Sequence, residues 1–237
     1  MSTAAAQQAA FDLAGRTLSS VWPMGWSLAD LQHHLGGIPT DRIRLVPPPG
    51  YATVLDLVQI AASEDRLYEL EDGVLVEKAM GWQEAILATL ISAELVAYLK
   101  THDLGQVLGA DGPLEILPGN VKLPDVAFVG WHRFPKQPLA RRPVPALVPD
   151  LVVEVLSETN TAAEMDRKLK QYFESGVTLV WYIDPRTRSA RVFTSPSDVM
   201  EVDEAGVLTG ARLLPGLRLC LQSLFERADR QAPRPAG

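Results

Sequence analysis

Two acidic residues interrupt apolar stretches of this sequence. Glu154 lies inside the run LVVEVL at 151–156, and Asp125 in LPDVAFV comes just before another apolar run. An ionised carboxylate inside a dry strand is costly unless a partner neutralises it. Pro124 cannot donate to a β ladder, so Asp125 should lie at the mouth of its strand, beside Glu154 if the two strands are neighbours.

Two converging carboxylates repel each other unless a cation lies between them. Hard divalent cations such as Mg²⁺, with Mn²⁺ as a substitute, prefer oxygen ligands and can turn a bound water into a nucleophile. We therefore predict that the carboxylates of Asp125 and Glu154 lie within about 6 Å of each other and share a metal ion. The alternative is structural: Glu154 pairs with an arginine or lysine, and Asp125 caps a turn.

Composition narrows the class of protein. The 237 residues are 47% hydrophobic and 22% charged, as in ordinary globular proteins. No apolar run approaches the roughly 18 residues of a membrane span, and the N-terminus lacks a signal-peptide pattern. One cysteine excludes an internal disulfide and favours a cytoplasmic location. The net charge of −7 argues against a general nucleic-acid coat protein but permits a locally basic groove. Neither a Walker A loop, a dinucleotide-binding GxGxxG nor a zinc spacing is present.

The segments around Glu154 predict a βαβ unit. Strand 150–156, a helix over 161–175 and strand 178–183 should give two parallel strands with a right-handed crossover. Earlier strands are joined by short turns and should be antiparallel, including a hairpin over 66–79 that turns at Asp72-Gly73. The sequence therefore predicts an α/β fold with a mixed central β-sheet and helices on both faces.

Three further helices are expected. Ser27 should cap a helix over 27–37, and Thr53 a helix over 52–65. The longest helix should span 82–105. One apolar stripe is formed by Ile86, Leu90, Ala93 and Ala97, and a second stripe beside it by Leu87, Ile91 and Leu95.

Five motifs occur in an order that resembles the PD-(D/E)XK restriction-endonuclease-like superfamily. More narrowly, they resemble a bacterial family of restriction endonucleases formerly called a domain of unknown function. The resemblance covers about residues 50–220 and implies an N-terminal helical arm over 1–50, a nuclease domain over 51–226 and a flexible tail over 227–237. The motifs are YELEDGVLVE, LPDVAFV, PDLVVEVLSETNT, DRKLKQYFESGV and WYIDP.

This resemblance implies Mg²⁺-dependent hydrolysis of DNA phosphodiester bonds by a metal-activated water, with Asp125 and Glu154 as metal ligands. Two residues after Glu154, where the superfamily has lysine, this chain has Leu156. The lysine looks to have moved to the next helix as Lys168, where it could orient the water and stabilise transition-state charge. Helical geometry does not separate Lys168 from its rival Lys170; the family pattern favours Lys168.

Further candidates lie on either side of these residues. Glu69 aligns with the family's hairpin glutamate and is a catalytic candidate. Glu84, at the start of the long helix, is a weaker one, because a carboxylate there also complements the helix dipole. The loop 131–149 has no acidic residue, and we predict that it contacts DNA phosphates beside Asp125, the alternative being a solvated loop. Its basic residues are Arg133, Lys136, Arg141 and Arg142.

Three functions remain open at this point. The first is a DNA endonuclease, with DNA as substrate and a homodimer implied by resemblance, since double-strand cutting by this fold commonly needs two active sites. The second is a catalytically inactive nuclease-fold module for binding or assembly. The third is an enzyme acting on another phosphate-containing substrate, with no membrane partner in any of the three.

Overall fold

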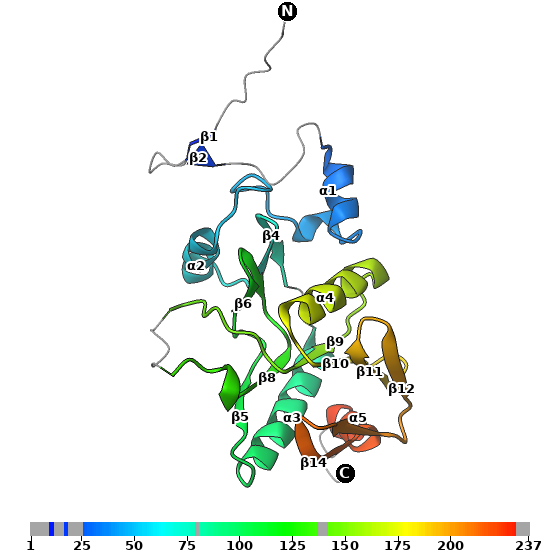
Figure 1. Ribbon diagram of the computed structural model, residues 1–237. Coiled ribbons are helices and arrows are strands. Elements are labelled where there is room, and N and C mark those ends of the chain that lie inside the picture. The colour runs from blue at the N-terminus through cyan, green and yellow to red at the C-terminus, as the bar shows by residue number, and fades with distance from the viewer. Residues whose placement is uncertain (1–9, 12–16, 19–25, 79–80, 137–141, 231–237) are drawn as a thin grey trace, which may run out of the picture.

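The computed structural model describes residues 10–11, 17–18, 26–78, 81–136 and 142–230. Its centre is a six-stranded sheet in the order β12-β11-β10-β9-β8-β5 (Figure 1). Within the described residues, no helix has the length and apolar character needed to cross a membrane. The strands of this sheet are β5 (Gly105–Leu108), β8 (Val126–Gly130), β9 (Leu151–Val155), β10 (Leu179–Asp184), β11 (Ser189–Ser195) and β12 (Asp198–Val202).

The sheet is mixed, as predicted. Strands β9 and β10 are parallel, with Glu154 in register with Tyr182, whereas β8 and β9 are antiparallel. The crossover between β9 and β10 is helix α4 (Ala162–Ser175). Thr161 caps the start of α4, and Gly176, with φ of 101°, ends it in the left-handed region that favours glycine. The predicted βαβ unit is confirmed.

Helices cover both faces of the sheet, as expected. Helix α3 (Trp82–Leu99) and helix α5 (Leu221–Ala228) pack on one face, and α4 packs on the other. Side chains alternate along each strand, so Val153 faces the core under α3, while Val152 faces the core under α4. Beyond β12, the short strands β13 (Val207–Gly210) and β14 (Leu214–Cys220) form a hairpin next to α5.

The predicted end of the long helix was wrong, and of the two apolar stripes that the sequence shows, the one with Leu87, Ile91 and Leu95 is buried. Ala93 and Ala97 are exposed, and α3 ends at Leu99 because the chain must turn before β5 begins at Gly105. Two neighbouring stripes of α3 are apolar at helical spacing, so periodicity could not show which of them faces the sheet. The buried residues of α3 are Leu87, Ala88, Ile91 and Leu95.

A second sheet, in the order β4-β3-β7-β6, carries the predicted hairpin. Asp72 and Gly73 form its two-residue turn, with φ of 46° and 74°. Leu70 of β3 pairs with Val121 of β7, which joins the hairpin to the segment that leads into Asp125. The strands are β3 (Tyr68–Glu71), β4 (Val74–Glu77), β6 (Leu114–Leu117) and β7 (Asn120–Lys122).

The N-terminal helices lie against this second sheet (Figure 1). Ser27 and Thr53 each form a capping box, as predicted, at the starts of helices α1 (Leu28–His34) and α2 (Val54–Ser63). The 3₁₀ turn η1 (Thr40–Arg42) follows α1. The described part of the predicted arm packs on β4, through the apolar cluster Leu31, Leu35, Ile38, Ile43, Val74 and Val76.

The remaining short elements are the paired strands β1 (Ala10–Phe11) and β2 (Thr17–Leu18) and the 3₁₀ turn η2 (Trp131–Arg133). Helix α5 continues through Ala228, inside the segment predicted as a tail over 227–237. Residues 231–237 of that segment lie outside the described residues.

Candidate active site

The two predicted metal ligands lie on adjacent strands. Val126 of β8 pairs with Val153 of β9, and one further step along this antiparallel register sets Asp125 opposite Glu154. Strand alternation directs both carboxylates to the face that α4 covers. Each residue is only 5% exposed. The structure therefore brings Asp125 and Glu154 together on one buried face of the sheet.

The partners of Glu154 come from α4. Lys168 Nζ lies 3.6 Å from Oε1 of Glu154, and the Tyr172 hydroxyl donates a hydrogen bond to the same oxygen. Lys168 and Tyr172 are four residues apart and so share one face of the helix. The ammonium of Lys168 and the hydroxyl of Tyr172 are therefore the partners of the buried Glu154 carboxylate.

Asp125 is held by the backbone and by a lysine that the sequence analysis missed. The Val155 N–H donates to Oδ2 of Asp125 at 2.7 Å, and Lys78 Nζ lies 2.8 Å from Oδ1. Lys78 directly follows β4 and has a side chain only 6% exposed. Its position near Asp125 depends on how the second sheet packs against the first, and no local pattern signals it.

Glu69 of β3, a candidate that the family resemblance implied, lies next to these residues. Its Oε1 lies 3.0 Å from Lys168 Nζ and accepts a hydrogen bond from the Leu123 N–H at 3.2 Å. Lys122 Nζ is 3.9 Å from Oε2 of Glu69, but its hydrogen-bond partner is Glu71. Lys168 is therefore shared between a carboxylate from each of the two sheets.

The two carboxylates that contact Lys168 titrate differently. Burial acts to raise the pKa of Glu69, but the positive charges of Lys168, Lys122 and Lys78 outweigh it and lower that pKa to about 2. Burial raises the pKa of Glu154 to about 7 despite Lys168, because the negative charge of Asp125 adds to the effect. Glu69 lies closer to Lys168 than Glu154 does and stays ionised. The ionised form of Glu154 is disfavoured.

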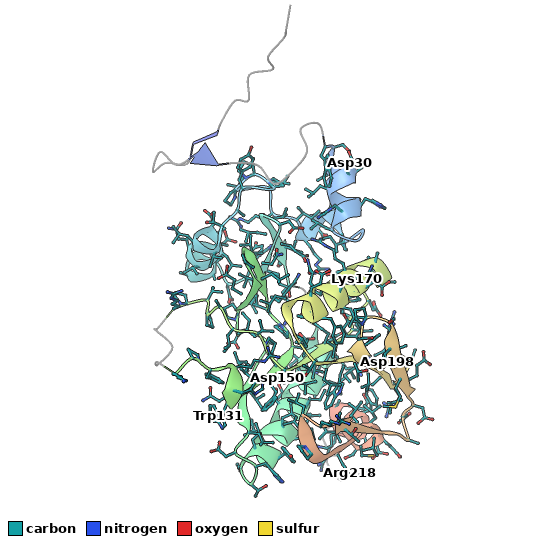
Figure 2. The ribbon with its side chains drawn as sticks, viewed as in Figure 1. Asp30, Trp131, Asp150, Lys170, Asp198 and Arg218 are labelled. Carbon is teal, nitrogen blue, oxygen red and sulfur yellow. The ribbon has the colours of Figure 1, made fainter. Side chains whose placement is uncertain are left out.

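The two candidate lysines of α4 have opposite environments. Lys168 is 6% exposed and contacts the carboxylates, whereas Lys170 is exposed on the outside of α4 (Figure 2). Burial acts to lower the pKa of Lys168, but Glu154 and Glu69 raise it well above its ordinary value. Lys168 is therefore protonated at neutral pH, which suits charge stabilisation and not general-base catalysis.

The carboxylates fit a hard divalent cation. Mg²⁺ is commonly bound by one or two carboxylates together with water and substrate phosphate. Among the described residues, no group of three or more His, Cys, Asp and Glu side chains has a metal-binding arrangement. A cation held by Asp125 and Glu154 would therefore need water or substrate for its other ligands. Glu69, Asp125 and Glu154 face the ammonium groups of Lys78 and Lys168, which leaves one negative charge in excess when Glu154 is ionised. That excess favours an added cation.

Glu84 and Arg133 are not brought to this constellation. Glu84 lies in the first turn of α3, on the other face of the central sheet. Arg133 Nε lies 2.8 Å from Oδ1 of Asp150, and its NH2 group donates to the Gly176 carbonyl. Asp150 precedes β9, at the opposite end of that strand from Glu154 (Figure 2 labels Asp150).

The rest of the predicted basic loop has no described contact with the carboxylates. Lys136 and Arg142 are both exposed, whereas Arg141 lies outside the described residues. Between Arg142 and β9 the loop returns to the second sheet, because Val144 packs in the same apolar cluster as Leu70 and Leu123. Lys136 and Arg142 are thus open to solvent, with Arg142 close in sequence to the segment that packs on the second sheet.

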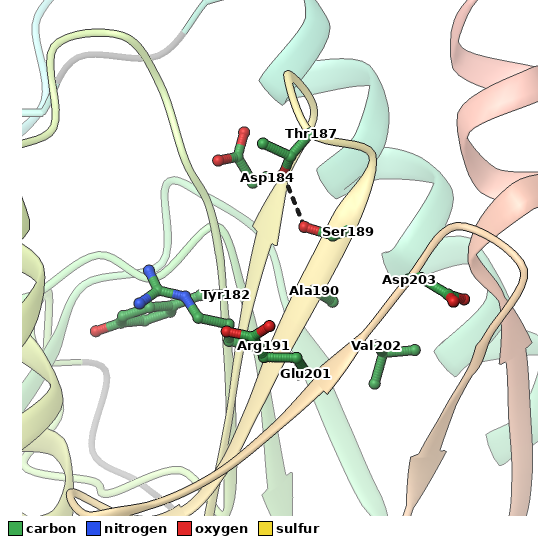
Figure 3. A pocket seen from close by; sticks show the side chains of 9 residues that line it. All are labelled: Tyr182, Asp184, Thr187, Ser189, Ala190, Arg191, Glu201, Val202 and Asp203. Carbon is green, nitrogen blue, oxygen red and sulfur yellow. Dashed lines mark hydrogen bonds between the residues drawn. The ribbon is translucent and has the colours of Figure 1, made fainter.

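A groove of about 620 Å³ lies beside the constellation, over β10, β11 and β12 (Figure 3). Arg191 lies over the ring of Tyr182, which is the strand neighbour of Glu154, with its guanidinium carbon 5.6 Å from the ring centre. Three carboxylates, Asp184, Glu201 and Asp203, line the groove against this one arginine. An acidic lining disfavours phosphate, so we do not assign the groove to a phosphodiester substrate.

Comparison with known proteins agrees with this architecture. The model of the Uma2 family, described as "Putative restriction endonuclease", matches residues 54–222, more than half of the chain. The structure is also similar to the crystal structure of a "putative nuclease belonging to DUF820" from Anabaena variabilis, with a TM-score of 0.62 and 15% sequence identity. The similarity covers 70% of this chain and 93% of the other. No curated protein matches the sequence.

Proposed function

The chain belongs to the Uma2 family of restriction-endonuclease-like proteins, and from this premise we propose that it is a Mg²⁺-dependent endonuclease that hydrolyses DNA phosphodiester bonds. The observation that carries the proposal is the convergence of Asp125, Glu154 and Lys168 on one buried face, with Glu69 beside them. Carboxylate oxygens that can bind a hard cation and an ammonium that can bind phosphate are the groups this chemistry needs.

Asp125 and Glu154 would hold the metal ion. When bound, Mg²⁺ stabilises negative charge on the phosphate and makes a nucleophile of water at neutral pH. The Val155 N–H fixes the orientation of the Asp125 carboxylate, and the Tyr172 hydroxyl fixes that of Glu154. Such preorganised ligands reduce the reorganisation that binding would otherwise require.

Lys168 would stabilise the transition state. Its ammonium is held by Glu69 at 3.0 Å and by Glu154 at 3.6 Å, so it is fixed and charged before substrate arrives. A fixed positive charge in a buried site stabilises the charge that develops on phosphate more strongly than a solvated one. Glu69 is then a positioning residue, which acts through Lys168.

DNA would be attracted by local cations, because the chain as a whole is acidic. Lys136 and Arg142 are exposed, and with Arg141 they are our proposed phosphate contacts. The ion pair of Arg133 with Asp150 gives that residue a structural use, which makes it the weakest of the four predicted contacts. A cytoplasmic location and a homodimer with two active sites remain parts of the proposal.

The test is cleavage of supercoiled plasmid DNA with Mg²⁺ or Mn²⁺. We expect the wild-type protein to nick or linearise the plasmid and EDTA to stop it. Asp125→Asn and Glu154→Gln keep the side-chain shapes and should abolish cleavage. Arg186→Gln, in an exposed ion pair with Asp184, is a control that should cleave normally.

Different results in this cleavage test would support one of the two alternative functions. DNA binding without cleavage under any metal condition would identify a nuclease-fold binding module. The lysine partners of Asp125 and Glu154 favour that alternative, because they satisfy both carboxylates without a metal. Metal binding at Asp125 without DNA affinity would indicate another phosphate-containing substrate.

A further inference from the structure

The ammonium of Lys78 is fixed by two hydrogen bonds and an ion pair. Its ammonium donates to the carbonyls of Ala110 and Leu123 and pairs with Oδ1 of Asp125 at 2.8 Å. Its own backbone N–H donates to the Leu67 carbonyl, which continues the hairpin pairing beyond β4. A lysine has three donors and no acceptor, and these contacts hold the ammonium of Lys78 on three sides.

This lysine satisfies a proposed metal ligand. Oδ2 of Asp125 accepts from the Val155 N–H, and Oδ1 is paired with Lys78. The described contacts therefore use both oxygens of Asp125. A divalent cation that binds Oδ1 of Asp125 must share this oxygen with the ammonium of Lys78 or displace it, and a cation bound at Oδ2 would still lie close to the ammonium. In either position the two positive charges repel at short range.

The net charge of the cluster indicates whether a bound cation shares Asp125 with Lys78 or displaces it. With Glu154 ionised, as metal binding requires, Glu69, Asp125 and Glu154 carry one negative charge more than Lys78 and Lys168 neutralise. Exchange of the Lys78 ammonium for a divalent cation would balance this cluster, whereas addition of the cation with Lys78 in place would leave it positive. Displacement is therefore the more favourable arrangement.

We propose that Lys78 is a built-in competitor for the metal site, which neutralises Asp125 in the metal-free protein and leaves when a divalent cation binds. The proposal rests on the proposed function, because it takes Asp125 as a metal ligand. Its consequence is a weakened metal affinity, so that the metal-free protein keeps a satisfied carboxylate and the loaded state forms only at higher metal concentrations. The alternative is that Lys78 serves only to join the two sheets through the Ala110 and Leu123 carbonyls.

The experiment is a titration of the full-length protein with Mn²⁺ alone, followed by electron paramagnetic resonance of the free ion. Lys78→Gln removes the charge but keeps an amide donor for a neighbouring carbonyl. We expect it to bind Mn²⁺ at least about tenfold more tightly than wild type. Lys100→Gln, at an exposed lysine that ends α3, makes the same change in net charge and should leave the affinity unchanged.

A structural role would give a different result. In that case Lys78→Gln lowers the melting temperature without metal but binds Mn²⁺ with wild-type affinity, and equal or weaker binding overturns the proposal. Asp125→Asn separates this failure from that of the proposed function. If Asp125→Asn also binds like wild type, Asp125 is not a ligand and both proposals fail; if it alone loses binding, only the role of Lys78 is wrong.

A measurement on the wild-type protein covers the case in which Lys78→Gln does not fold. The carbonyl ¹³C resonances of Ala110 and Leu123 report the hydrogen bonds from Lys78. Saturation with Mg²⁺ should shift both as the ammonium leaves. Resonances that stay in place while Mg²⁺ binds at Asp125 would show that Lys78 is not displaced.

Discussion

The ammonium of Lys168 lies 3.6 Å from Oε1 of Glu154, on the buried face between α4 and the central sheet. We predict that Lys168→Met abolishes plasmid cleavage, whereas Lys170→Met, at an exposed position on the same helix, changes it little. Lys168→Met also leaves Glu69 and Glu154 without their shared cation, so it should destabilise the metal-free fold by about 3–5 kcal/mol. Cleavage is therefore measured at a temperature where circular dichroism shows both variants folded. Loss of cleavage in Lys170→Met, with Lys168→Met active, would reverse the assignment.

The raised pKa of Glu154 predicts a pH-dependent stability. Burial and the charge of Asp125 raise this pKa to about 7, above its unfolded value, so the folded state binds the extra proton between about pH 4.5 and 7. The stability that Glu154 contributes is complete below this window and lost as pH rises through it. Glu154→Gln has no such proton to lose. Its stability relative to the metal-free wild type should rise by up to about 3 kcal/mol from pH 4.5 to pH 8.

Urea unfolding of the two proteins across this pH range provides the measurement. The matched control is Glu94→Gln, which removes a half-exposed carboxylate on α3. Its stability relative to wild type should stay nearly level across the same window. A level difference for Glu154→Gln as well would mean that Glu154 is ionised throughout and fully neutralised by Lys168.

The sequence predicted the strands, the helix and the hairpin that carry the candidate site. Strands β9 and β10 are short apolar runs joined by an amphipathic helix, which favours a parallel pair with α4 as crossover. That topology alone directs Glu154 and the first turns of α4 toward each other. The Asp72-Gly73 turn similarly fixed the register of the hairpin that carries Glu69.

Contacts between the two sheets could not be predicted in this way. Lys78 reaches Asp125 only because β3 and β4 pack beside the start of β8, a relation that no local pattern encodes. The buried stripe of α3 could not be selected from the sequence for a related reason, because two apolar stripes are available and only tertiary packing selects one.

The hydroxyl of Tyr172 should set the pH at which Glu154 works. Because it donates to Oε1, it stabilises the ionised carboxylate, and its removal in Tyr172→Phe should raise the pKa of Glu154 above about 7. A hydrogen bond to a charged group contributes roughly 1.5–3 kcal/mol, so cleavage at pH 7 should fall by about tenfold or more. The log of kcat/KM measured against pH should show its acidic limb moved upward, with activity recovered near pH 9. A uniform loss at every pH would indicate a packing defect instead.

The ion pair between Arg42 and Glu164 should stabilise the start of α4. Two guanidinium nitrogens contact the two carboxylate oxygens at 3.2 and 2.9 Å, and the side chains are 10% and 5% exposed. Arg42→Met alone leaves Glu164 buried and unpaired, which should cost about 3–5 kcal/mol in urea unfolding. Adding Glu164→Leu should restore much of that loss, because the buried charge is then gone as well. The control Arg66→Met breaks an exposed pair with Glu77 and should change stability little.

The exposed Lys136 and Arg142 should set the salt dependence of DNA binding, whereas Arg133, which is paired with Asp150, should not. Removing one cation that binds a phosphate lowers the slope of log K against log salt by about 0.9, so Lys136→Gln combined with Arg142→Gln should reduce it by about 2. The guanidinium of Arg133 is already bound to Asp150 and the Gly176 carbonyl, so Arg133→Gln should lower the melting temperature and leave the slope unchanged. Fluorescence anisotropy of a labelled duplex over a range of KCl concentrations measures these slopes. Should Arg133→Gln flatten the slope while the double variant keeps it, DNA approaches the sheet from the Asp150 end, and the proposed phosphate contacts near the second sheet are wrong.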